Sequence, residues 1–273
     1  MKIKQELTGA FAIGLAAGVL RVAQYIWTIG PDGYYTGGLL STLLNILLIL
    51  LLGAGVLWSL LCGFYKKGQT SFDGMFARQP AVKLLTGLLG ILAAADGTYR
   101  LATGDNTVIS LLILAGAIGW LLLALMGSKM PGPAAILPVL QLGAMIISYF
   151  WSTYKFIQVS EYTVVVLGLC ALCFFTLLVL KAAIGADCSR GRLTAAACLV
   201  TVFGFAAFLA PPVGGLSIAK LILSAEGIAA ILLAALVLRQ MPEVKPEPET
   251  PDIPDLSALN EYISNIPEVE EED

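Results

Sequence analysis

Residues 106–128 read NTVISLLILAGAIGWLLLALMGS and contain no Asp, Glu, Lys or Arg. A helix needs about 20 apolar residues to cross a bilayer, so this stretch is long enough to span one. Four further stretches are equally free of charged residues and also long enough: 33–65, 130–154, 162–180 and 193–219. Together they predict a protein built from transmembrane helices.

The composition of the whole chain agrees with this prediction. Of the 273 residues, 58% are hydrophobic and 13% are charged, against roughly 45–50% and about 25% in soluble domains. The mean hydropathy is +0.86. These values exclude a soluble globular protein, a disulfide scaffold, a disordered chain and a nucleic-acid binder.

Three more spans appear when single charged residues are tolerated, which brings the total to eight. The predicted helices cover approximately 7–29, 38–64, 81–102, 107–127, 134–154, 161–184, 193–212 and 216–239. They form an all-α polytopic bundle, residues 1–240, composed of four helical hairpins: 7–64, 81–127, 134–184 and 193–239. If the third helix were re-entrant instead, the count would be seven and the two termini would lie on opposite sides.

The distribution of Lys and Arg predicts the orientation of the bundle. With eight helices, eleven bases fall on the side that holds both termini and three on the opposite side. Because cytoplasmic loops carry an excess of Lys and Arg, we expect both termini in the cytoplasm. Lys2 and Lys4 precede an apolar run too long for a cleaved signal peptide, so we interpret that run as a retained first helix.

Ionisable residues within the spans are the most informative feature for function. Burying a charge in a membrane is costly, and such residues usually face a partner or a water-filled cavity. At a rise of about 1.5 Å per residue, Arg21, Asp96 and Glu226 lie about 12, 9 and 15 Å below the predicted outer surface. The three residues therefore belong to the same half of the membrane.

These charges predict a polar pocket that opens outward. Asp96 and Arg100 are spaced i, i+4 and are expected to pair on one helix face. Arg21 and Glu226 are then expected to pair or to meet in the same pocket, because each would be costly alone. The full set of predicted pocket residues is Arg21, Gln24, Asn45, Asp96, Tyr99, Arg100, Ser224 and Glu226. Aromatic residues near this level, Tyr149 among them, are typical of a membrane-interface belt, and some of them are candidates for the pocket mouth.

Catalytic and metal-binding motifs are scarce in the sequence. The chain contains no histidine, which removes Ser-His hydrolase chemistry, His-based proton relays and His-x-x-x-His zinc sites. Cys170-x-x-Cys173 has a metal or redox spacing, but it lies inside an apolar helix, where small packing side chains are the simpler interpretation. We therefore expect a protein that is not an enzyme and has no cofactor and no metal site.

The last residues form a separate acidic segment. Residues 241–273 carry eleven acids and one base, whereas residues 1–240 carry fifteen bases and eight acids. The Pro-rich part favours an extended spacer. Beyond it, the spacing of apolar residues predicts a short helix at 256–266. Its apolar face is a candidate docking site for a cytosolic protein and consists of Leu256, Leu259, Ile263 and Ile266. A disordered solubilising tail is the alternative.

The stretch RVAQYIWTIGPDGYYTGG, residues 21–38, resembles a sequence motif found in uncharacterised multi-pass membrane proteins of Gram-positive bacteria. In those proteins an Arg and a Gln on the first helix precede a short outer turn with Pro, Gly and aromatic residues. This chain departs from the form at Asp32-Gly33, where an acid followed by Thr-Gly is expected. The resemblance implies a bacterial cytoplasmic membrane and directs attention to Arg21 and the first outer turn.

Two functions remain open at this point. In the first, the protein transports or senses a small solute or ion at the outward-facing pocket, with Arg21 as an anion contact or counter-ion. Glu226 would then be its partner or a titrating group. In the second, the protein is a membrane scaffold or assembly factor whose ion pairs hold helices together and whose tail binds a cytosolic protein. Lipid is the expected surrounding partner in both.

Overall fold

The computed structural model describes residues 3–30, 37–66, 68–70, 79–154, 160–184, 188–214 and 217–240. Its main helices are α1 (Ile3–Trp27), α2 (Leu39–Phe64), α4 (Pro80–Ala102), α5 (Thr107–Met126), α6 (Leu137–Tyr154), α7 (Ser160–Ala183), α8 (Arg190–Phe208) and α9 (Ile218–Gln240). The described segments thus contain eight helices that are long and apolar enough to cross a membrane. The predicted all-α, eight-helix fold is confirmed.

The third predicted span, for which a re-entrant form was the alternative, is a continuous helix. α4 has 23 residues, and α5 after it has 20. At about 1.5 Å per residue, a helix of this length covers the roughly 30 Å of a hydrocarbon core. The structure therefore favours eight spans over seven.

The helix ends follow local sequence signals. The Asn106 side chain caps α5 by accepting hydrogen bonds from the backbone N–H groups of Val108 and Ile109, at 3.0 and 3.3 Å. Pro80 begins α4, where a missing N–H is tolerated. The structure corrects the end of α8, which was predicted at 212 and lies at Phe208. The prolines at the start of the 3-10 turn η3 (Pro211–Gly214) cannot continue an α-helix.

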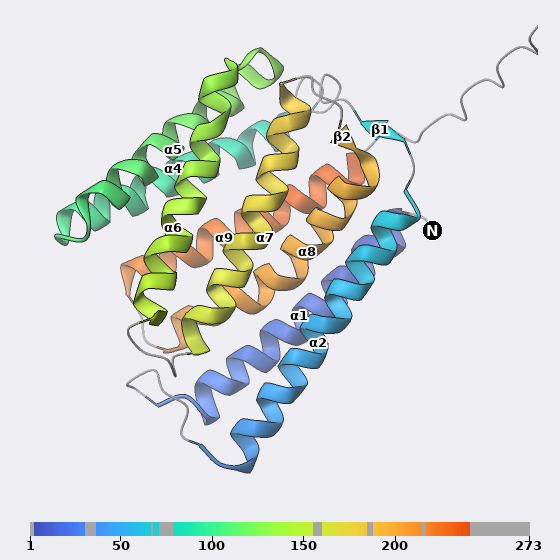
Figure 1. The fold of residues 1–273 in the computed structure, drawn as a ribbon, viewed down its shortest axis with the longest axis vertical. Helices are drawn as coiled ribbons and strands as arrows, with labels where there is room; N and C mark the ends of the chain where they lie inside the picture. Colours follow the sequence, from blue (N-terminus) through green and yellow to red (C-terminus); the bar gives the residue numbers. More distant parts are fainter. Residues whose placement is uncertain are drawn as a thin grey trace, which may run out of the picture. The chain divides into compact units, whose positions relative to one another are not determined.

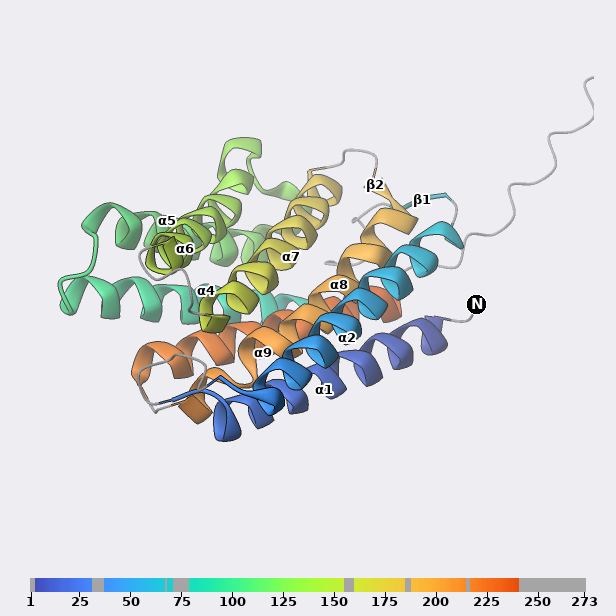
Figure 2. The same cartoon turned by 60° about the horizontal axis from the view of Figure 1, so that its bottom comes forward.

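Six of the helices form a closed ring. Each of α4, α5, α6, α7, α8 and α9 contacts the next in this order, and α9 returns to contact α4. α1 and α2 pack against each other and against the outside of α8 (Figures 1 and 2). α8 is consequently the most buried of the candidate spans. Its inward positions are rich in alanine and glycine, which lets several helices approach it closely.

The outer surface of the bundle is apolar. Large side chains such as Leu50 on α2, Ile91 on α4 and Ile147 on α6 are more than half exposed. Soluble monomers rarely expose apolar patches larger than a few hundred Å². These faces are suited to contact with lipid, and the protein is a multi-pass membrane protein by this criterion.

A short antiparallel strand pair joins two connections at one end of the bundle. β1 (Gln69–Thr70), after α2, pairs with β2 (Cys188–Ser189), before α8. The N–H of Arg190 also donates to the carbonyl of Gly68 at 3.1 Å. α1 begins and α9 ends toward this same end, as an even number of antiparallel helices requires (Figures 1 and 2). We call it the strand-pair end.

The chain divides into two units, Met1–Met241 and Pro242–Asp273. All the helices described above belong to the first unit. The predicted tail helix at 256–266, with its candidate docking residues Leu256, Leu259, Ile263 and Ile266, lies outside the described residues, and so does the turn at residues 31–36.

Candidate polar site

The core of the site is an ion pair on α4. The Nε of Arg100 donates to Oδ2 of Asp96 at 2.9 Å, one helical turn away. Both side chains are at least 90% buried. The i, i+4 pairing expected from the sequence is therefore confirmed.

The Arg100 guanidinium also links α4 to the neighbouring loop and to α6. Its Nη1 donates to Oδ2 of Asp105 at 3.1 Å and to Oγ of Ser148 at 3.3 Å. Its Cζ lies 5.7 Å from the ring centroid of Tyr149. Arg100 is thus a junction between three segments of the chain rather than one half of an isolated pair.

This position over the ring gives Arg100 a cation–π contact with Tyr149. Ser148, Tyr149 and Asp105 were not among the predicted pocket residues. Only Tyr149 had a signal in the sequence, as a member of the aromatic group near the outer interface.

Glu226 is the second buried acid of the site. It lies on α9, which packs against α4, and it is 5% exposed. It is within electrostatic range of both Asp96 and Arg100. Its Oε1 is buried and has no hydrogen-bond partner among the residues that the structure describes. The Oγ of Ser224, on the same helix, is also buried and has no hydrogen-bond partner among the described residues.

The charges of this group do not balance. Three carboxyl groups, those of Asp96, Asp105 and Glu226, surround one guanidinium, that of Arg100. Arg100 bonds directly to the two aspartates. Among the described residues, Arg100 makes no hydrogen bond to Glu226, the third acid. We call Asp96, Arg100, Tyr149 and Glu226 the acidic cluster.

Arg21 belongs to a different group of polar residues. Its Nη1 donates to Oε1 of Gln24 at 2.7 Å, and its Cζ lies 5.1 Å from the ring centroid of Tyr25. The Nε2 of Gln24 then donates to Oδ1 of Asn45 on α2 at 3.0 Å. Arg21 and Gln24 are almost completely buried. This network ties α1 to α2.

The expectation that Arg21 and Glu226 pair or share one pocket stays a prediction. Arg21 contacts Gln24 and Tyr25, whereas Arg100 is the cation within electrostatic range of Glu226. The reason is the helix order: α1 packs mainly on α2 and α8, whereas α9 packs on α4 and α8. The small-residue stripe of Gly14 and Gly18 faces Thr201 and Phe205 of α8.

The eight predicted pocket residues are therefore distributed over two places. Arg21, Gln24 and Asn45 form the α1–α2 network, while Asp96, Arg100 and Glu226 form most of the acidic cluster. Ser224 lies two residues from Glu226. Tyr99 is half-buried on α4, and within the described part of the chain its side chain makes no recorded hydrogen bond.

A second buried acid–base pair escaped the sequence analysis. Oε1 of Glu6 lies 3.4 Å from Nζ of Lys66, and the indole N–H of Trp58 donates to the Glu6 carbonyl at 3.1 Å. The thiols of Cys62 and Cys198 lie near this pair and close to each other. No periodic pattern marked Glu6, because it lies in the first turns of α1, where a charge is ordinary.

The described cysteines and acids do not form a metal site. All five cysteines are free, including Cys170 and Cys173 of the Cys-x-x-Cys motif. No group of three or more Cys, Asp or Glu ligands suited to a metal ion occurs in the described segments.

The fold and the site define an all-α, multi-pass membrane protein with a buried acidic cluster. No family model matches the sequence, and neither a curated protein nor a solved structure matches it.

Proposed function

We propose that the protein binds a small cation, or a solute that carries an amine, at the acidic cluster, and that this binding serves transport or sensing. The observation that carries the proposal is the buried Oε1 of Glu226, which has no hydrogen-bond partner among the described residues. A buried polar atom without a partner costs free energy, and a buried ionised carboxylate costs more. A bound cation, ammonium group or proton would offset that cost.

The charge balance supports a positively charged ligand. The two acids of the cluster, Asp96 and Glu226, and the adjoining Asp105 have one guanidinium near them, so one more positive charge would improve the balance. Intramembrane acids that face a helix bundle commonly mark ion or proton pathways. The anion-binding role expected for Arg21 has less support, because Gln24 and Tyr25 already occupy its guanidinium.

Thermal unfolding of the full-length protein in detergent tests the proposal. Sodium, potassium and methylammonium chlorides would be compared at equal ionic strength and at several pH values. A cation bound only by the folded state stabilises it by about 1.4 kcal/mol at ten times its Kd. We expect such an increase for one of these cations or for protons, and we expect Glu226→Gln to abolish it.

Glu6→Gln is the matched control, because it removes a buried carboxylate from the other end of the bundle and should preserve the response. An equal response in the wild type and in Glu226→Gln would overturn the proposal, as would a protein whose stability depends on neither cations nor pH. Uptake of the stabilising cation into proteoliposomes then distinguishes transport from sensing.

A scaffold function is the second candidate, and the α1–α2 network favours it. Arg21, Gln24 and Asn45 form a chain of hydrogen bonds inside the bundle, which suits a structural link between α1 and α2. Deleting residues 255–273 tests the partner-binding part of this proposal. Loss of a specific co-purifying cytosolic protein would support it, and an unchanged set of co-purifying proteins would oppose it.

A further inference from the structure

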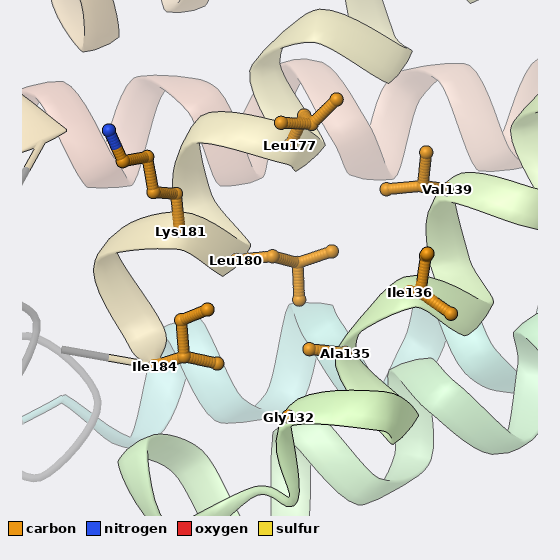
Figure 3. Close-up of a pocket in the computed structure, with 8 residues that line it drawn as sticks. All are labelled: Gly132, Ala135, Ile136, Val139, Leu177, Leu180, Lys181 and Ile184. Atoms are coloured by element: carbon orange, nitrogen blue, oxygen red, sulfur yellow. The ribbon is translucent and has the colours of Figure 1, made fainter. Parts of the chain in front are cut away.

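A groove of about 400 Å³ lies between α6 and α7, at their strand-pair end. Apart from Lys181, every residue that lines it is apolar. Leu180 of α7 and Val139 of α6 extend into the space between the two helices, and Gly132 lies at its lower edge (Figure 3). A Cβ atom added at Gly132 would meet nothing within 4 Å, so the groove is open there.

Two bases lie at this end of the helices. Lys181 rises from the α7 side of the groove, and its amine extends away from the α6 residues (Figure 3). Arg192 lines a smaller groove of about 250 Å³ formed with α2 residues. Lys181 lies in the last turn of α7 and Arg192 in the first turn of α8, so the two bases flank β2, which joins these helices. Within the described segments, neither base forms an ion pair with an acid.

The groove suits the acyl chain of a lipid, and the two bases suit an anionic headgroup. An apolar groove on a lipid-facing surface favours a hydrocarbon chain, because dispersion contacts depend on close packing. Basic pockets between membrane helices bind the phosphates of anionic lipids. The groove is small for a helix, which is about 10 Å wide, and this argues against a partner helix.

We propose that this surface binds an anionic phospholipid, with one acyl chain in the α6–α7 groove and the phosphate held by Lys181 and Arg192. The proposal does not depend on the function of the acidic cluster, which lies toward the other end of the helices. It requires only that the strand-pair end reaches a membrane–water interface.

Native mass spectrometry of the full-length, delipidated protein tests the proposal. Dioleoyl phosphatidylglycerol and dioleoyl phosphatidylcholine would be titrated separately. Each base near the headgroup is expected to favour the anionic lipid about fivefold. We therefore expect Lys181→Gln to weaken phosphatidylglycerol binding about fivefold and to leave phosphatidylcholine binding unchanged. Gly132→Leu fills the groove and should weaken the binding of both lipids.

Two matched controls separate these effects from general ones. Arg239→Gln removes an exposed base from the same end of the bundle, and Gly53→Leu adds a side chain at an open, exposed glycine of α2. Both should retain wild-type binding, and Lys181→Arg should restore the preference for phosphatidylglycerol. Equal binding of the two lipids to the wild type would overturn the proposal. Equal losses in Lys181→Gln and Arg239→Gln, or a dimer that Gly132→Leu dissociates without any lipid adduct, would also overturn it.

Discussion

At the scale of single residues, the acidic cluster depends on how one guanidinium is shared. Arg100 contacts a buried aspartate on its own helix and a second aspartate whose side chain is 44% exposed. Burial strengthens an electrostatic interaction but raises the cost of leaving a charge alone. The two carboxylates are chemically identical, so their environments alone should make their contributions differ.

We expect Asp96→Asn to lower the free energy of unfolding by about 3–5 kcal/mol, because it leaves Arg100 poorly compensated in a buried site. Asp105→Asn should cost less than about 1 kcal/mol, since its carboxylate is partly solvated. Reversible unfolding in mixed detergent measures both values. Equal losses in the two variants would contradict this assignment.

At the scale of elements, α8 organises the bundle through close contacts with its neighbours. The glycine stripe of α1 lies against it, and a Cβ atom at Gly14 would come within 2.8 Å of the carbonyl oxygen of Thr201. Packing of this kind depends on the absence of a side chain. It fixes α1 on α8 and thereby keeps Arg21 in the α1–α2 network.

Gly14→Ala should destabilise the protein by about 1–3 kcal/mol, because the added methyl group forces α1 away from α8. Gly53→Ala is the matched control, since a Cβ there meets nothing within 4 Å. It should be neutral or stabilising by up to about 1 kcal/mol through helix propensity. Thermal unfolding of both variants checks the prediction, and a Gly14→Ala protein as stable as Gly53→Ala would refute it.

At the scale of the whole molecule, the alternation of eight helices places the start of α1 and the end of α9 at the same end of the bundle. The excess of Lys and Arg at that end predicts that it faces the cytoplasm. The acidic cluster would then lie toward the outer surface, and the lipid groove in the inner leaflet.

A membrane-impermeant maleimide tests this orientation in intact cells. We expect a single cysteine introduced at Asn106, in the α4–α5 connection, to be labelled from outside in a variant without the natural cysteines. A cysteine at Gln240 should be labelled only after the cells are permeabilised. The reverse pattern would invert the topology, and labelling of both positions in intact cells would contradict an even number of spans.

Much of this architecture is local and was therefore predictable. Charge-free stretches long enough to cross a bilayer predicted the helices, and the i, i+4 spacing predicted the Asp96–Arg100 pair. Each depends on residues close together in the chain. α8 ends at Phe208 and not at 212, because Pro211 and Pro212 cannot continue an α-helix.

The sequence by itself determined the number of spans, their approximate bounds and which charges lie within them, because hydrophobicity and helix periodicity are properties of single segments. Only the tertiary structure decided which charges meet. Arg21 and Glu226 had matching depths, but depth does not specify which helices are neighbours. The packing of α1 on α2 and α8 and of α9 on α4 and α8 gives them different neighbours, because helix contacts depend on the shapes of faces that lie far apart in the sequence.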